Sequence, residues 1–250
     1  MANYTIAEDF ELPSKGVIYG EAKVAPTVKL RSWTGREELR RLNSSQLHYK
    51  SLSDLIQDCI INKDEIGVPV YDMCLGDFEF LLHRLRVVTY GEEYPVVIRC
   101  PYCGEVVENN INLYDLGVNE IDRKEWEEAL TVMLPKSKCK VTLRYTTPRM
   151  LDEIADKVEE LKVEGEDTSV LLKLVAHIEK IDGEKKDFSS LKNFIYSLPV
   201  SDFNLIDKKI NTLDEIVGLD KKVMVKCNHC KEKIPTTFQY NREFFRPEIY

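Results

Sequence analysis

Two short cysteine motifs organise this chain: Arg99-Cys-Pro-Tyr-Cys-Gly-Glu105 and Lys226-Cys-Asn-His-Cys-Lys-Glu232. In each motif two residues separate the cysteines, a spacing that lets both thiolates of one turn bind the same ion. A run rich in β-branched residues precedes each motif, at 94–98 and 223–225. An extended-looking segment follows each motif, at 106–111 and 234–240. The order strand, cysteine turn, strand therefore occurs twice, which is the plan of a zinc ribbon.

Together the motifs predict one structural zinc ion, bound by Cys100, Cys103, Cys227 and Cys230. Four cysteine ligands complete a tetrahedral site and leave no open coordination position. The chain between the two motifs is far longer than the roughly 15 to 20 residues over which ordinary ribbons close. Closing so long a loop costs about 4 kcal/mol plus a constant. A structural zinc contributes on the order of 10 kcal/mol, so the long loop is tolerable.

Redox chemistry is the main alternative for the first motif. A redox dithiol stands where a helix opens in a βαβ unit, and neither motif has that context. His229 lies inside the second motif, and we interpret it as an exposed turn residue. The single cysteines Cys59, Cys74 and Cys139 are interpreted as small core residues.

An internal repeat explains the long interval between the motifs. The segment Val28-Lys-Leu-Arg-Ser-Trp-Thr-Gly-Arg36 is matched by Val141-Thr-Leu-Arg-Tyr-Thr-Thr-Pro-Arg149, with Val, Leu, Arg, Thr and Arg at the same offset. A Leu-Pro pair precedes each segment. An Asp-Phe pair that begins an apolar helical pattern follows each, at Asp77 and Asp202. The shared order of these features indicates a duplication in which each half supplies one cysteine motif.

Helix signals fall at matching places in the two halves. Thr34-Gly-Arg-Glu37 is a capping box that predicts a helix through about Leu42. Thr147 followed by Pro148 predicts a second helix start. Apolar residues recur at helical spacing over 52–60, 78–85, 171–178 and 191–198, and we also expect a helix over 122–133 around Trp126.

We therefore expect an α+β fold of two internally duplicated halves, joined by a composite four-cysteine zinc ribbon. Each half consists of a strand plus helices plus a zinc-knuckle hairpin. The expected division is 1–120 for the first repeat, 121–240 for the second repeat and 241–250 for an aromatic C-terminal tail. A chain of 250 residues that is 43% hydrophobic can bury a core in either half.

Composition narrows the classes of function. The formal net charge of −8 argues against a protein that coats nucleic acid, because neutralising phosphates needs a basic face. No apolar run approaches the roughly 20 residues of a membrane span. The first ten residues lack the basic and apolar regions of a secretory signal. The seven cysteines are therefore expected in a reducing compartment, where metal binding is commoner than disulfides.

Catalytic motifs are absent from the sequence. It has no Gly-x-Ser-x-Gly elbow, no glycine-rich phosphate loop and no His-Glu-x-x-His helix. The four histidines are scattered, and none stands in a recognisable catalytic setting. We expect a protein that is not an enzyme and has no small-molecule substrate.

The order of motifs along nearly the whole chain resembles the T-even phage baseplate hub subunit family. The resemblance is carried by Leu12-Pro-Ser-Lys-Gly-Val-Ile-Tyr19, the 28–38 segment, Cys100-Pro-Tyr-Cys-Gly104 and the late Cys-x-x-Cys. The second motif departs from the commoner Cys-Pro-x-Cys-Gly form, since it has Asn228 and Lys231. This departure leaves the predicted ligands in place.

The resemblance implies a structural or assembly component of a contractile-tail baseplate hub. It implies location in the virion tail, assembly in the host cytoplasm, and partners such as the other hub proteins and the tape measure. A zinc-ribbon nucleic-acid-binding regulatory protein is the alternative. The lysines around the second motif favour that alternative, while the net charge of −8 and sparse aromatic stacking partners argue against it.

The C-terminal tail is unusually apolar for a chain end, because it contains Phe244, Phe245, Arg246 and Pro247. Two interpretations remain open. The phenylalanines could fold back on their own chain, or the segment could bind a neighbouring subunit, since aromatic residues and arginine are favoured at interface centres.

Overall fold

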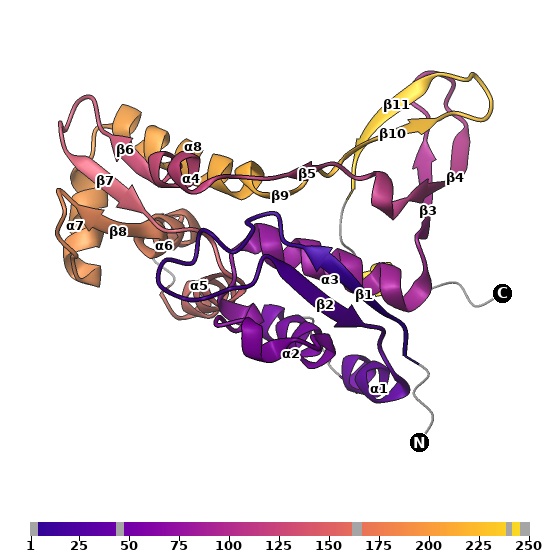
Figure 1. Ribbon diagram of the computed structural model, residues 1–250. Helices are drawn as coiled ribbons and strands as arrows, with labels where there is room; N and C mark the ends of the chain where they lie inside the picture. The colour runs from indigo at the N-terminus through magenta and orange to yellow at the C-terminus, as the bar shows by residue number, and fades with distance from the viewer. Residues whose placement is uncertain (1–4, 44–47, 162–166, 239–241, 246–250) are drawn as a thin grey trace.

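The structure is a computed structural model that describes residues 5–43, 48–161, 167–238 and 242–245 (Figure 1). Within these residues the chain forms eight α-helices and five small antiparallel sheets, which confirms the α+β class. None of the helices in the described part is long and apolar enough to span a membrane.

The first half begins with a two-stranded sheet, continues with helices, and ends in the first knuckle hairpin. Its elements in chain order are β1 (Ala7–Glu11), β2 (Thr27–Arg31), α1 (Gly35–Asn43), α2 (Tyr49–Cys59), η1 (Lys63–Glu65), η2 (Val70–Asp72), α3 (Leu75–Tyr90), β3 (Glu93–Arg99) and β4 (Val106–Asn112). The capping box at the start of α1 is confirmed, because the Thr34 backbone N–H donates to the Glu37 carboxylate at 2.8 Å.

The second half repeats this order, with the strands β8 and β9 and the helix α7 added. A connection formed by η3 (Leu113–Asp115), β5 (Val118–Asn119) and α4 (Arg123–Ala129) leads into it. The elements that follow are β6 (Thr131–Met133), β7 (Lys140–Leu143), α5 (Pro148–Glu160), α6 (Thr168–His177), β8 (Ile178–Ile181), α7 (Phe188–Ser197), α8 (Val200–Ile216), β9 (Gly218–Leu219), β10 (Lys222–Lys226), β11 (Lys233–Thr237) and η4 (Arg242–Phe245). Thr147 caps α5 by accepting from the Met150 N–H, with Pro148 in the first turn, as the sequence predicts.

Equivalent elements of the two halves make equivalent contacts. Leu30 of β2 forms a β-bridge with Ile60, and Leu143 of β7 pairs with Ile178 in the same way. In each half the chain turns after the Leu-Pro pair, and the lysine that follows the serine of this turn has a left-handed backbone. The φ angle is 51° at Lys15 and 56° at Lys138. The sequence repeat is therefore also a repeat of strand pairing and turn geometry.

The expected helix over 122–133 is wrong in its second part. Helix α4 ends at Ala129, and Thr131–Met133 forms β6. Val132 of β6 pairs with Val141 of β7, and the Leu143 N–H donates to the Leu130 carbonyl at 2.8 Å. Pairing with a distant strand thus ends a helix that local periodicity would continue.

The buried apolar residues form three clusters. One lies mainly within the first half, one within the second half, and the smallest lies between the two knuckle hairpins. The first cluster also includes Val217, Leu219 and Phe238 from the second half. The two halves therefore interlock, and the boundaries at residues 120 and 240 stay a prediction.

Helix α3 crosses the β9 strand of the other half at a pair of glycines. A Cβ atom on Gly76 would lie 2.1 Å from the Val217 carbonyl oxygen, and one on Gly218 would lie 2.7 Å from the Gly76 Cα. Only glycine permits so close an approach of helix and strand. Figure 1 shows the helices and the three-stranded sheet of the second half to one side of this crossing and the two knuckle hairpins standing together at the other.

Candidate metal centre

Each cysteine motif forms a tight turn between two paired strands. In the first turn the Cys100 N–H donates to the Glu105 carbonyl at 2.8 Å and the Gly104 N–H donates to the Cys100 carbonyl at 2.9 Å. The second turn has the same two bonds, from Cys227 to Glu232 at 2.9 Å and from Lys231 to Cys227 at 3.1 Å. The predicted arrangement of strand, cysteine turn and strand is thus present in both halves.

The fold brings the four sulfurs of these turns together. The Sγ atoms of Cys100, Cys103, Cys227 and Cys230 all lie within 4.8 Å of one another. Two of the separations, Cys100 to Cys230 and Cys103 to Cys227, are 3.7 Å. A tetrahedral zinc site with Zn–S bonds of about 2.3 Å has S···S edges of about 3.8 Å, so the arrangement fits a zinc ion.

The cluster is buried on one side and open on the other. Cys100 and Cys227 are buried, whereas Cys103 and Cys230 are exposed. The two buried cysteines pack with Val107, Val225 and Ile234 in the smallest apolar cluster. This packing holds one cysteine of each turn in place beneath the open side of the site.

Two asparagines connect the hairpins beside the sulfurs. The Asn228 side-chain amide donates to the Glu108 carbonyl of β4 at 3.1 Å, and the Asn109 amide donates to the Lys226 carbonyl of β10 at 3.3 Å. The sequence reasoning missed both roles. The one available signal was that Asn228 replaces the proline of the commoner motif. In the structure the Asn228 side chain links the second turn to the first hairpin.

The electrostatics of the cluster favour a bound cation. Burial opposes ionisation of Cys227, but the backbone N–H groups of Cys230 and His229 outweigh it and lower the pKa of Cys227 to about 6. At Cys230 the Glu232 N–H favours the thiolate, yet burial and the neighbouring sulfurs raise the pKa of Cys230 to about 12. The four thiols therefore lose all their protons only when a positive ion balances the charge of the thiolates, as in metal sites with thiolate ligands.

The remaining single residues lie largely where the sequence analysis places them. Cys59 and Cys74 are buried, whereas Cys139 is only half-buried. His229 is exposed in the second turn. Among the residues that the structure describes, the four-sulfur cluster is the one group of cysteine, histidine or acidic side chains close enough together to hold a metal ion.

The aromatic tail packs on its own chain. Phe244 is 1% exposed and Phe245 is 5% exposed. The Phe245 ring stacks on Trp33 with centroids 4.8 Å apart, and the Arg86 Nε donates to the Phe244 carbonyl at 3.2 Å. These contacts match the interpretation in which the phenylalanines fold back, and they leave both rings unavailable to a partner. Arg246 and Pro247 lie outside the described residues.

Two of the lysines around the second turn already have partners within the chain. The Lys221 Nζ lies 2.6 Å from a Glu79 carboxylate oxygen, and the Lys231 Nζ donates to the Asn228 carbonyl at 2.6 Å. The Glu79 carboxylate offsets the charge of Lys221, and the carbonyl occupies one donor of Lys231, so these two lysines are less available to nucleic-acid phosphates.

Together these features define a mixed α+β protein whose two repeated halves meet at a cluster of four thiols. Comparison with known protein families extends this description. The family described as "T4 bacteriophage base plate protein" matches residues 1–246, so the chain belongs to that family. No curated protein and no solved structure matches the chain.

Proposed function

We propose that this chain is a structural or assembly component of the hub of a contractile-tail baseplate, with a zinc ion that joins its two halves. The observation that carries the proposal is the convergence of one cysteine turn from each half at a single four-sulfur cluster. Membership of the base plate family supports the location in the virion tail. Other hub proteins and the tape measure are the proposed partners, and assembly takes place in the host cytoplasm.

The zinc ion has a structural role in this proposal. Cys100, Cys103, Cys227 and Cys230 would hold it, and its charge would balance thiolates that cannot all ionise alone. Each turn positions its sulfurs through backbone hydrogen bonds, and Asn109 and Asn228 align the two hairpins. Because four protein ligands fill the coordination shell, the site has no place for a reacting water, and we propose a non-enzymatic protein.

The first experiment measures metal content. Elemental analysis of the purified protein is expected to give about one zinc per chain, as a four-cysteine site implies. The double variant Cys103→Ser, Cys230→Ser is expected to lose the zinc, because it removes one ligand from each turn. The variant Cys59→Ser, Cys139→Ser is the matched control and is expected to keep the zinc. A full zinc content in the first variant would exclude this ligand set.

The second experiment asks where the protein resides. Mass spectrometry of purified tail particles is expected to detect the chain with the hub proteins. An assembly factor that leaves would instead copurify with hub intermediates and be missing from mature particles, and both results agree with the proposal. Absence from particles and intermediates, together with a salt-dependent DNA or RNA gel shift, would favour the nucleic-acid alternative.

A further inference from the structure

The two halves place an arginine at the same position before a capped helix. Arg31 ends β2 three residues before Thr34, and Arg144 follows β7 three residues before Thr147. In the first half the Arg31 Nη2 lies 2.9 Å from the Glu37 Oε1. The other oxygen of Glu37 accepts from the Thr34 N–H at 2.8 Å. A carboxylate therefore fills the space between the arginine and the start of α1.

The donors around Glu37 bind that carboxylate strongly. Burial opposes ionisation, but hydrogen bonds from Arg31 and Thr34 lower the pKa of Glu37 to about 2. Arg31 also donates to the backbone carbonyls of Ser32 and Asp58 at 3.1 Å, so its guanidinium is fully engaged. The first half thus shows what this set of donors binds when it is complete.

The second half has the same donors without the acceptor. The residue equivalent to Glu37 is Met150, whose thioether cannot take the place of a carboxylate. Across the part of the chain that the structure describes, no hydrogen bond or ion pair engages the Arg144 guanidinium, and none engages the Thr147 N–H. Arg144 is exposed, so its guanidinium is accessible to a group from another molecule.

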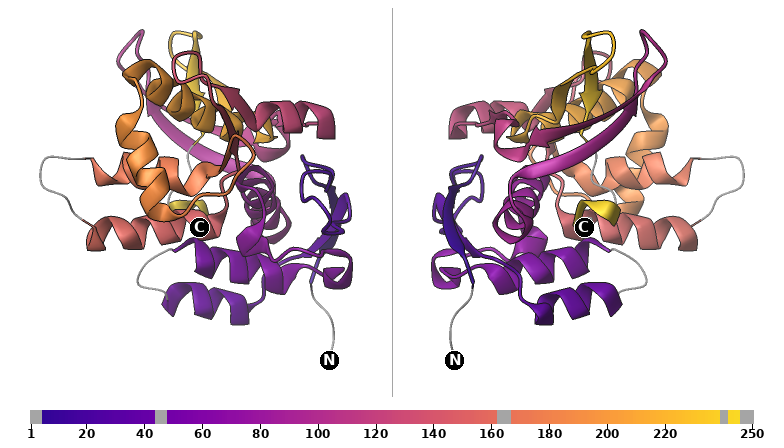
Figure 2. Two further views of the ribbon diagram at one scale, coloured as in Figure 1. Left: turned by 90° about the vertical axis from the view of Figure 1, so that its left-hand side faces the viewer. Right: turned by 90° about the vertical axis from the view of Figure 1, so that its right-hand side faces the viewer.

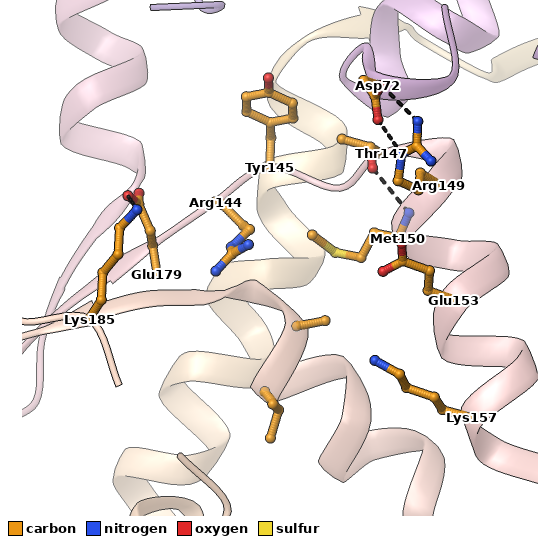
Figure 3. A pocket seen from close by; sticks show the side chains of 12 residues that line it. Asp72, Arg144, Tyr145, Thr147, Arg149, Met150, Glu153, Lys157, Glu179 and Lys185 are labelled. Atoms are coloured by element: carbon orange, nitrogen blue, oxygen red, sulfur yellow. Dashed lines mark hydrogen bonds and ion pairs between the residues drawn. The ribbon is translucent and has the colours of Figure 1, made fainter. Parts of the chain in front are cut away.

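Arg144 and Thr147 line a cavity of about 550 Å³ at the junction of β7, α5 and α6 (Figure 3). The lining residues that matter for binding are Arg144, Thr147, Arg149, Met150, Glu153 and Lys157. Figure 3 shows Arg144 and Lys157 on different sides of the cavity with no interaction drawn to either. A cavity of this size admits one side chain or a short peptide segment.

The charge of the lining is net positive once its internal pairs are set aside. Arg149 forms a bidentate pair with Asp72 at 2.5 and 2.9 Å, so these two charges are committed to each other. Glu179 and Lys185 also line the cavity, and they form a second internal pair at 4.0 Å. Among the described lining residues that remain, Arg144 and Lys157 have no ion-pair partner, and Glu153 opposes them as a single negative charge. The electrostatics therefore favour an anionic occupant.

We propose that this cavity is a docking site for an acidic side chain of a neighbouring tail protein. The partner's carboxylate takes the position in the second half that Glu37 holds in the first, bound by Arg144 and the Thr147 N–H, with Lys157 at the rim. The occupant is an Asp or Glu side chain because the equivalent donors in the first half bind a carboxylate. The inference rests on the proposed function, since that function supplies the neighbouring protein.

The test uses the purified full-length protein and a fluorescently labelled hexaglutamate peptide, with hexaglutamine as the neutral comparison. The wild-type protein is expected to bind hexaglutamate saturably and hexaglutamine much more weakly. Arg144→Gln is expected to weaken hexaglutamate binding by about tenfold or more, as loss of a charge-assisted hydrogen bond implies. Arg36→Gln is the matched control, because Arg36 is an exposed arginine at the start of the other repeated helix. It is expected to leave binding unchanged.

A second variant supplies the missing carboxylate from within the chain. Met150→Glu recreates the capping box and the arginine pair of the first half. It is expected to reduce hexaglutamate binding to the level of Arg144→Gln while leaving the thermal midpoint equal to or above that of the wild type. Reduced binding in a folded protein would show that an internal carboxylate and an external one compete for the same place.

Three outcomes would overturn the inference. The first is no saturable binding of hexaglutamate, and the second is equal binding by the wild type and Arg144→Gln. The third is displacement of the peptide by an equal concentration of inorganic phosphate, which would show a small-anion site. Any of these in a protein that carries zinc and is found in tail particles would overturn the docking site alone. Absence from tail particles and intermediates would overturn the proposed function instead.

Discussion

At the scale of single residues, the two halves each use one buried aspartate to hold the turn after the first strand. Asp77 accepts from the Ser14 N–H at 3.0 Å and from the Tyr19 hydroxyl at 2.6 Å. Asp202 accepts from the Ser137 N–H at 2.7 Å and from its hydroxyl at 2.8 Å. Asp77 and Asp202 thus accept equivalent hydrogen bonds from the turn in their own half, although the groups around them differ.

The surroundings shift the two acidities in opposite directions. Burial raises the pKa of Asp77, although hydrogen bonds from Ser14 and Tyr19 favour the carboxylate. Burial also opposes ionisation of Asp202, but there the hydrogen bonds from Ser137 and Lys136 outweigh it and lower the pKa of Asp202. Ionised Asp202 therefore stabilises the fold, whereas ionisation of Asp77 carries a cost.

We predict opposite pH dependences for Asp202→Asn and Asp77→Asn. The deficit of Asp202→Asn relative to the wild type should be full at pH 7 and shrink as the pH falls below the usual aspartate pKa of 3.8. The wild type should instead gain stability relative to Asp77→Asn as the pH falls from 7 through the raised pKa of Asp77. Thermal unfolding across this range measures both differences, and comparison with the wild type cancels the pH dependence of the shared cysteines. Slopes of the same sign would contradict the prediction.

At the scale of elements, the two knuckle turns share one backbone shape with different residues. The residue after the second cysteine is left-handed in both, with φ of 79° at Gly104 and 67° at Lys231. Such a conformation costs a side-chain-bearing residue roughly 1–2 kcal/mol. A Cβ on Gly104 would meet no atom within 4 Å, so the backbone alone accounts for the difference between the two positions.

Exchanging these residues should therefore change stability in opposite directions. Lys231→Gly is predicted to stabilise the protein by about 1 kcal/mol or less, since it relieves the backbone but loses the bond from Lys231 to Asn228. Gly104→Lys is the matched reverse change and is predicted to destabilise by about 1 kcal/mol. Denaturant unfolding of the zinc-loaded proteins measures both. A destabilised Lys231→Gly would mean that the Lys231 side chain matters more than its backbone.

At the scale of the whole molecule, distant segments close the core of the first half. Phe244 of η4 packs against His83 of α3 and Tyr94 of β3, with ring centroids 6.2 and 5.6 Å away. Arg86 lies over the same ring, with its guanidinium carbon 5.7 Å from the centroid. The C-terminal turn thus covers α3 on the side opposite the sheet of β1 and β2 (Figure 2).

We predict that Phe244→Ala lowers stability by about 3 kcal/mol or more, as truncation of a buried phenylalanine does. Zinc content should be unchanged, because Phe244 lies outside the cluster of residues around the cysteines. Leu39→Ala is the control: Leu39 is 71% exposed, so this change should stay within about 0.5 kcal/mol of the wild type. Near-wild-type stability of Phe244→Ala would instead favour the interpretation in which the tail binds a neighbouring subunit.

The sequence by itself determined the features that depend on short spacings. In the two Cys-x-x-Cys turns and at the capping residues Thr34 and Thr147, the interacting residues are two or three positions apart. The structure of these segments could therefore be predicted from the local sequence. The order of these features was enough to predict the α+β class and its repetition. Four sulfurs from two distant turns could be grouped because a tetrahedral metal needs all four.

Only the tertiary structure decided the features that depend on contacts between distant segments. Pairing with β7 turned 131–133 into a strand, and burial against α3 placed Phe244 in the core. Asn228 acquired its role by bonding to the other hairpin. Arg31 and Arg144 look alike in sequence, yet one is paired and the other faces an open cavity. Local patterns specify what a residue can bind, whereas the packing of the whole chain decides which partner comes within reach.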